Sequence, residues 1–350
     1  MNRRCPRTTL NVFRTSLVMV LLCGALVGCG ASSQDSIPTD VLKAAGHTTQ
    51  LGDGRFMSKV TVIKPNKDCL HINDPSSNQI LCLDDDLNVL HTIGSAGEGP
   101  GEFTYIRHFV VQNDKLFAYD EGRRRIHVFS MKGVYERTIA LPSNIFGGFA
   151  VDPEENLYIT AHPSDFPIIK LDSQGNVVQQ FGKNLGTTDS EVQNRQRSAR
   201  FLVMTPDQKL ITIGAKIPVI EKYSLGGDLL DSLDLSRHSL FAPRLAYADE
   251  KYAAEKISNK TVMVVNHIEL IDKTLYVLII TGVPKKDLRV NTLLAMNIET
   301  LEVEHIYKLS DDKGNPLLWV DAFGSTTGGD LLVFHGSEGI FYRYTNPFPI

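Results

Sequence analysis

The sequence predicts an all-β fold, a six-bladed β-propeller with four-stranded antiparallel blades. Strand-like runs recur with turn signals every eight to twelve residues, and no helical period dominates the chain. These runs also group in fours, and the group repeats six times. A repeat of this kind buries the faces of each sheet against its neighbours, which is how a propeller builds its core.

The clearest unit covers residues 107–140 and contains the runs "RHFVVQ", "KLFAYD", "RIHVFS" and "VYERTIA". The other units are residues 59–94, 148–182, 200–235, 268–309 and 319–345. The last unit shows only three strands and would leave a long edge unpaired. We therefore expect the β-like stretch 47–53, just ahead of the first unit, to supply its outer strand and close the ring.

A glycine-rich stretch, "IGSAGEGPGEF" at residues 93–103, separates the first two units. It is not a P-loop, because Pro100 stands where the lysine must be. It is not a dinucleotide fingerprint either, because Glu102 replaces the third glycine and a β-rich segment follows. Several positive-φ positions between two strands are typical of a tight loop, so we interpret it as an inter-blade crossover.

Three phrases carry a family resemblance. "GEGPGEF" in this position, with "RRIHVFSMKGVY" and "GFAVDPEENLYIT" further on, resembles the six-bladed propellers of the NHL and TolB-like kind found in bacterial lipoproteins. The resemblance covers residues 47–345 as architecture, and its motifs are strong only in the first three units. Such propellers mostly scaffold interactions and only sometimes carry enzymes, so the resemblance supports the fold far more than a function.

The N-terminus predicts export. Four arginines precede the apolar run "LVMVLLCGALV" at residues 17–27, which has the length of a signal-peptide core. The stretch "LVGC" ending at Cys29 resembles the bacterial lipoprotein signal, which implies cleavage before Cys29 and acylation of its thiol. An ordinary signal peptide cut nearby is the alternative. The predicted organisation is a signal peptide (1–28), a flexible tether (29–45) and the propeller (46–350).

The net charge of the mature chain and the residue after Cys29 bear on two further properties, nucleic-acid binding and the membrane in which the protein is anchored. Removing residues 1–28 leaves 32 basic and 40 acidic residues, a net charge of −8, so we expect no nucleic-acid binding. Gly30 is not the aspartate associated with inner-membrane retention, which favours a lipid anchor in the outer membrane. Whether the protein faces the periplasm or the cell surface stays open.

Two cysteines, Cys69 and Cys82, lie in a predicted hairpin. Pairing the strands about the turn centre places Cys69 opposite Cys82 and Leu70 opposite Leu81, so a cross-strand disulfide fits an exported protein. Directly opposed residues are not an easy fit to disulfide geometry. Two buried thiols that pack as small apolar side chains are therefore the alternative.

The predicted strand order places all the long connections on one face of the ring. These loops carry a charge of +3, and the remainder of the mature chain carries −11. We expect a short exposed helix at 247–257, where acidic residues and lysines have helical spacing. The predicted binding residues of this face are Arg107, Arg124, Arg200, Arg289 and His162.

These observations favour a binding module over an enzyme. Arginine side chains suit carboxylate, sulfate or phosphate groups, so the expected partners are an envelope protein or an anionic glycan. No zinc motif and no nucleophile motif is present, and no cofactor is expected. The alternative is a lyase or lactonase of the propeller type, with a divalent metal such as calcium bound at the channel mouth by His267, Glu269 and Asp321.

Overall fold

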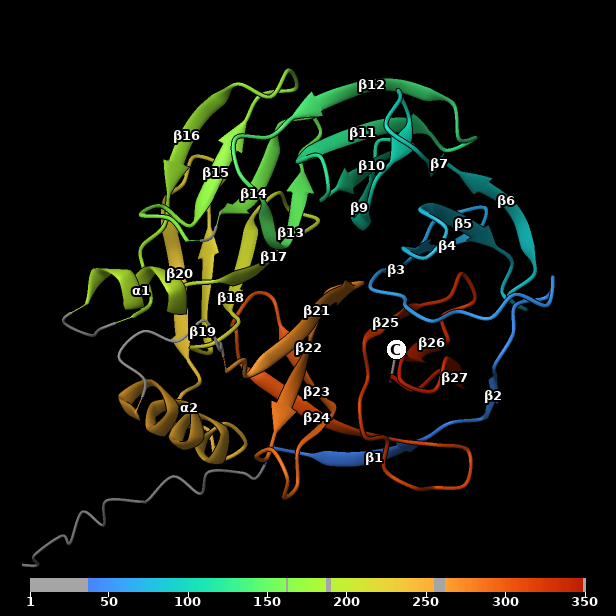
Figure 1. The fold of residues 1–350 in the computed structure, drawn as a ribbon. Helices are drawn as coiled ribbons and strands as arrows, with labels where there is room; N and C mark the ends of the chain where they lie inside the picture. Colours follow the sequence, from blue (N-terminus) through green and yellow to red (C-terminus); the bar gives the residue numbers. More distant parts are fainter. Residues whose placement is uncertain (1–36, 162, 187–189, 255–261, 349–350) are drawn as a thin grey trace, which may run out of the picture. The chain divides into compact units, whose positions relative to one another are not determined.

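The computed structural model describes residues 37–348, apart from 162, 187–189 and 255–261. Cys29 and the first part of the predicted tether, residues 29–36, lie outside these residues, and so does His162. Within them, six antiparallel blades are arranged around a central channel (Figure 1), which confirms the predicted all-β propeller. A parallel contact between the innermost strands of blades 3 and 4, at Gly147 and Phe201, joins these two blades into one eight-stranded sheet. No helix among the described residues is long and apolar enough to cross a membrane.

The blades follow the chain in order, and the first strand of each lies at the channel. Blade 1 consists of β3 (Ile63–Pro65), β4 (Leu70–Asp74), β5 (Gln79–Leu83) and β6 (Val89–Ile93). Blade 2 consists of β9 (Ile106–Gln112), β10 (Lys115–Asp120), β11 (Arg125–Ser130) and β12 (Tyr135–Ala140). Blade 3 consists of β13 (Ile145–Val151), β14 (Leu157–Ala161), β15 (Ile168–Leu171) and β16 (Val177–Phe181).

The second half of the ring repeats this order. Blade 4 consists of β17 (Arg200–Met204), β18 (Leu210–Gly214), β19 (Val219–Tyr223) and β20 (Leu229–Asp234). Blade 5 consists of β21 (Val265–Ile271), β22 (Thr274–Thr281), β23 (Arg289–Asn297) and β24 (Val303–Ser310). Blade 6 contains β25 (Ala322–Ser325), β26 (Leu331–His335) and β27 (Ile340–Tyr344).

The ring closes as predicted. Strand β2 (Gly46–Thr48) pairs antiparallel with β27, with His47 opposite Tyr342, so an N-terminal segment completes blade 6. The strand is shorter than the expected stretch 47–53. One further strand, β1 (Thr39–Lys43), pairs in parallel with β24 as a fifth strand of blade 5. The predicted tether was therefore too long, because backbone pairing fixes residues 39–43 to the propeller.

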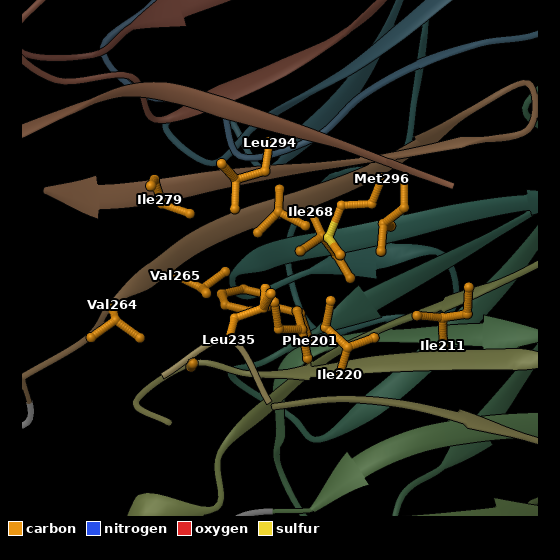
Figure 2. Packing of buried hydrophobic residues seen from close by; sticks show 14 of the residues in the cluster. Phe201, Ile211, Ile220, Leu235, Val264, Val265, Ile268, Ile279, Leu294 and Met296 are labelled. Carbon is orange, nitrogen blue, oxygen red and sulfur yellow. The ribbon is translucent and has the colours of Figure 1, made fainter. Parts of the chain in front are cut away.

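The core lies between the blades. Inner strands are buried on both faces, as in β22, where the six residues Leu275–Ile280 are all buried. Outer strands have exposed residues, as in β20. Figure 2 shows Phe201 of blade 4 beside Ile268 and Met296 of blade 5, in a cluster that joins these neighbouring sheets. Burial of apolar side chains between twisted sheets holds such a ring together.

The glycine-rich stretch is an inter-blade crossover, as predicted. It contains two short strands, β7 (Ser95–Ala96) and β8 (Glu102–Phe103), which pair in parallel between β6 and β9. Gly94 and Gly101 have φ values of 75° and 77°, in the left-handed region that glycine adopts without strain. Its glycines thus serve the backbone of the turn.

The register of the β4–β5 hairpin differs from the prediction by two residues. Leu70 lies opposite Leu83, and Cys82 lies opposite His71. Cys69 is therefore not directly opposed to Cys82, and the structure joins the two as a disulfide with a Cα–Cα distance of 5.7 Å. The diagonal placement removes the geometric objection to a directly opposed pair.

Two helices lie in the long loops. The helix α2 (Ala242–Ala254) confirms the one expected near 247–257, although it begins five residues earlier. The helix α1 (Glu191–Arg197) was not predicted. The Ser190 side chain accepts a hydrogen bond from the backbone N–H of Gln193 at its start, which is ordinary N-capping.

Candidate anion-binding channel

The central channel contains a cavity of about 520 Å³. It is lined by the innermost strands of blades 1 to 5 and by residues just ahead of β25. Three lining side chains are cationic, namely Lys59, Lys64 and Arg107, and two are acidic, namely Glu269 and Asp321. Aromatic and apolar groups such as Phe146, Phe149 and Trp319 complete the wall. This mixture and volume are typical of a small-ligand site.

Lys59 and Arg107 lie at the end of the channel where the inner strands begin, which we call the mouth. The Lys59 ammonium donates a hydrogen bond to the Tyr105 hydroxyl over 2.6 Å and, among the described residues, forms no ion pair. The Arg107 guanidinium lies 3.6 Å from the Glu121 carboxylate, a loose and partly exposed contact. Arg107 is thus only loosely paired, and Lys59 interacts electrostatically with the Asp321 carboxyl group on the same cavity.

A β-bulge directs Arg107 into the channel. Tyr119 pairs with His108 and Asp120 pairs with Ile106, so Arg107 is an extra residue in β9. Bulges change the direction of a side chain and often occur beside functional sites. The strand order alone could not show this, because a bulge depends on pairing with the neighbouring strand.

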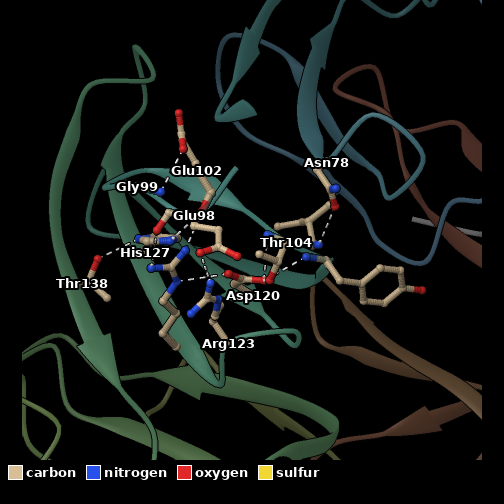
Figure 3. Close-up of polar contacts among 12 residues, drawn as sticks. Asn78, Glu98, Gly99, Glu102, Thr104, Asp120, Arg123, His127 and Thr138 are labelled. Carbon is tan, nitrogen blue, oxygen red and sulfur yellow. Dashed lines mark hydrogen bonds and ion pairs between the residues drawn. The ribbon is translucent and has the colours of Figure 1, made fainter. Parts of the chain in front are cut away.

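Contacts between blades 1 and 2 fix this part of the mouth (Figure 3). The buried Asp120 carboxylate accepts hydrogen bonds from the backbone N–H groups of Thr104 and Tyr105, at 3.2 and 2.9 Å. The Arg125 guanidinium donates to the same carboxylate over 3.1 Å. Asp120 thereby fixes the backbone at Tyr105, the residue whose hydroxyl holds Lys59.

Deeper in the channel, Lys64 of blade 1 forms an ion pair with Glu269 of blade 5. His267 lies 3.8 Å from the same carboxylate. His108 is close to this group, and its pKa is lowered well below the usual value because the surrounding protein desolvates its ring and Lys64 opposes a second positive charge. His108 is therefore neutral at physiological pH, and Lys64 supplies the positive charge at this level.

Asp321 lies at the mouth beside Trp319. Its carboxylate accepts a 2.7 Å hydrogen bond from the backbone N–H of Gly336 and another from the Trp319 side chain. Burial raises its pKa above the usual value, despite these bonds. Its charge is thus already partly compensated, and the cationic character of the mouth comes from Lys59 and Arg107.

Of the four predicted binding residues that the structure describes, only Arg107 lines this cavity. Arg200 is buried inside blade 4, where its guanidinium lies 2.9 Å from the Glu221 carboxylate, so its prediction as an overhanging rim residue was wrong. Arg124 is exposed on the loop between β10 and β11, and Arg289 is half-buried at the start of β23. The structure does not bring these arginines together.

The three alternative metal ligands also line the cavity, but among the described residues their ligating atoms do not gather into one group. Glu269 forms an ion pair with Lys64, and the Asp321 carboxylate accepts a hydrogen bond from the backbone N–H of Gly336. In the described part of the chain, the only cluster of ligating atoms lies in blade 1 and includes neither residue. A lysine ammonium therefore occupies the place beside Glu269 that a divalent cation would need.

Sequence reasoning did not identify Lys59, Lys64, Tyr105 or Trp319. Lys59 precedes the first short strand and Lys64 lies within it, so neither appears in a long loop. Position at or just ahead of a predicted channel strand is the signal that could have found both. Trp319 is the single tryptophan of the chain and begins the last unit, which is a second such signal.

Comparison with known proteins agrees with the fold. A family model described as a 6-bladed beta-propeller matches residues 53–226. No protein among curated sequences matches the chain. Among solved structures, a Bacteroides fragilis NCTC 9343 protein that is described as an exported protein is similar to this chain. The match has a TM-score of 0.54 and 14% identity, and it covers 85% of this chain and 86% of that one.

A member of the DUF4221 family from Bacteroides vulgatus has a TM-score of 0.54 and 9% identity, over 87% of this chain and 97% of that one. The virginiamycin B lyase from Staphylococcus aureus has a TM-score of 0.48 and 13% identity, over 79% and 77% of the two chains. Identities this low show the fold alone, and the last similarity carries no conclusion about activity. The chain is a six-bladed β-propeller.

Proposed function

We propose that this protein is a lipid-anchored propeller of the NHL and TolB-like kind that binds an anionic glycan at the mouth of its central channel. The observation that supports the proposal is the position of Lys59 and Arg107 on one concave cavity, where Arg107 has only a partly exposed contact with Glu121 and Lys59 forms no ion pair among the described residues. Ammonium and guanidinium groups bind carboxylate and sulfate by charge-assisted hydrogen bonds. No cofactor is needed for this role.

The shape of the site favours a glycan over an envelope protein as the ligand. A cavity of about 520 Å³ has the size of small-molecule sites, and its apolar wall includes Trp319 and Phe146. Protein partners usually bury a wider surface. A sugar residue carrying a carboxylate or sulfate would place its charged group at the mouth and its ring against this wall.

The binding role is tested with the full-length protein in mild detergent. We expect oligosaccharides with uronic acid or sulfate groups to bind and their neutral counterparts not to bind, as measured by calorimetry. The double variant Lys59→Glu, Arg107→Glu should weaken binding at least about tenfold, because it removes two charge-assisted contacts and adds repulsion. The matched control is Arg124→Glu, an exposed arginine outside the cavity, which should bind as the wild type does.

Two outcomes would contradict the glycan proposal. Equal binding of charged and neutral sugars would remove the role of the cations, and unchanged binding by the double variant would remove the site. Binding to an envelope protein by the wild type but not by the double variant would keep the site and change the ligand class.

The anchor is tested separately at Cys29. We expect Cys29→Ala to move the protein from the membrane to the soluble fraction and to abolish labelling with a fatty-acid analogue, because the thiol is the only proposed lipid attachment point. Sucrose-gradient separation of the two membranes tests the outer-membrane location. Full membrane retention of the Cys29→Ala protein would contradict lipid anchoring, and it would leave the channel proposal standing.

A further inference from the structure

Blade 1 contains a cluster of two cysteines and one histidine that is separate from the channel cavity. We propose that this cluster becomes a binding site for a thiophilic metal ion, such as Zn²⁺, when the Cys69–Cys82 disulfide is reduced. The ligands are Cys69 Sγ, Cys82 Sγ and His71 Nε2, with His91 as the fourth. This inference does not depend on the ligand that the channel binds.

The distances fit a metal centre. The ligand atoms of Cys69, His71 and Cys82 all lie within 4.8 Å of one another, and all three residues are buried. Cys69 Sγ lies 3.4 Å from His71 Nε2. In a tetrahedral zinc site with bonds of about 2.0–2.3 Å, neighbouring ligand atoms lie roughly 3.3–3.8 Å apart. The separation of Cys69 Sγ and His71 Nε2 already falls in this range, and the two sulfur atoms would move apart to reach it once the disulfide is opened.

The strand register places His91, the proposed fourth ligand, on the same face of the sheet as Cys82 and His71. Cys82 lies opposite His71 on β4 and opposite His91 on β6, so the three residues form a row across neighbouring strands. Residues that are directly opposite in antiparallel strands share one face of the sheet. His91 is exposed on the outer strand and is not part of the group within 4.8 Å, so its side chain would turn towards the cysteines to act as the fourth ligand.

The surroundings also orient the buried histidine. The ring of His71 hydrogen-bonds the backbone of Lys64 in the neighbouring strand β3. Metal-binding histidines commonly use the second ring nitrogen in this way, which fixes the ring and directs the other nitrogen at the metal. Here Nε2 lies 3.4 Å and Nδ1 3.8 Å from Cys69 Sγ, so the ring lies beside the sulfur and Nε2 is the nearer nitrogen.

The disulfide must be reduced before the cysteines can bind a metal ion. A dithiol reductant gives two electrons and two protons to the Cys69–Cys82 bond, which yields two thiols, while the reductant becomes a disulfide. Zn²⁺ then displaces the two thiol protons and forms two Zn–S bonds. Oxidation by a disulfide of higher potential releases the metal and restores the bond, so metal occupancy reports the local thiol–disulfide balance.

The test uses the full-length protein in mild detergent, prepared oxidised and reduced with dithiothreitol, then freed of reductant without air. We expect the reduced protein to retain about one Zn²⁺ per chain, and the oxidised protein to retain none, by elemental mass spectrometry. Co²⁺ should give thiolate charge-transfer absorption only in the reduced protein. Circular dichroism confirms that both forms are folded.

Variants locate the site. We expect Cys69→Ser, Cys82→Ser to abolish metal retention and His91→Ala to weaken it at least about tenfold, as for a lost ligand or its support. The matched control is His47→Ala, on the outer strand of another blade, which should retain the metal. Three outcomes would each overturn the proposal. They are zinc retention by the oxidised protein, zinc retention by the double serine variant, and loss of zinc from reduced protein that is still folded.

Discussion

Replacing Arg200 by alanine is expected to destabilise the protein by about 3–5 kcal/mol, the usual cost of breaking a buried ion pair on one side. The Arg200 guanidinium lies 2.9 Å from the Glu221 carboxylate, and the two side chains are 0% and 9% exposed. Arg200 also donates a hydrogen bond to the backbone carbonyl of Lys183. Truncation leaves the Glu221 carboxylate in blade 4 without its counter-charge.

The measurement is chemical denaturation followed by the fluorescence of the single tryptophan, Trp319. The exposed Arg124→Ala is the control and should change the free energy of unfolding by less than about 0.5 kcal/mol. The double variant Arg200→Met, Glu221→Leu should recover most of the loss, because apolar residues of similar size often replace a buried pair at little cost. A stable Arg200→Ala protein that had lost its ligand would instead restore Arg200 as a binding residue.

Acid is expected to destabilise the protein through His127, by up to about 3 kcal/mol between pH 6.5 and pH 4. Burial lowers the pKa of His127 from 6.5 to about 4, and Arg125 adds to the effect. Its ring is fully buried, donates from Nε2 to the Glu102 carbonyl over 3.0 Å and lies 2.8 Å from the Thr138 hydroxyl through Nδ1. Both contacts suit the neutral ring.

The direction of this pH effect follows from the protonation of His127 in the folded and in the unfolded protein. Above pH 6.5 the histidine is neutral in both the folded and the unfolded protein, so the stability is fully present. As the pH falls from 6.5 towards 4, the unfolded chain binds a proton that the folded protein does not, and stability is lost. Below about pH 4 both states are protonated, and this contribution no longer changes.

Denaturation curves measured at several pH values test this prediction. His127→Gln should have a smaller loss of unfolding free energy on acidification than the wild type, whatever its stability at neutral pH. His47→Gln is the control, because His47 is exposed on the surface, where its ring lies beside the Asp312 carboxylate and the Tyr342 ring. A wild-type stability that did not fall between pH 6.5 and 4 would contradict the buried neutral state of His127.

The predicted binding residues show which features of the site could be inferred from the sequence and which could not. Arg107 and Arg200 both stand at the start of predicted channel strands, and sequence reasoning assigned both to the rim. Arg107 is the extra residue of a bulge and faces the channel, whereas Arg200 pairs regularly with Gly214 and meets Glu221 from β19. The difference depends on strand pairing and on a partner 21 residues away, and neither is visible in a local pattern.

The β4–β5 hairpin gives a second case. The sequence placed the turn between two correct strands, but centred it one residue too early, and this moved the register by two. In the structure the Asp74 carboxylate accepts hydrogen bonds from the Ser76 backbone N–H and the Ser77 hydroxyl, and Asn78 adopts a φ of 54°. These bonds fix which residues form the turn, and therefore which residue lies opposite Cys82.

The all-β class, the six repeated units, the closing N-terminal strand and the crossover role of the glycine stretch could all be predicted from the amino-acid sequence. These features follow from alternation of apolar residues and from turn residues, which act over a few neighbouring positions. The folded structure was needed to show which cations line the channel, which are buried, and how Cys69, His71 and Cys82 come together. Register and burial arise from contacts between distant strands, because side-chain direction depends on the pairing of whole sheets.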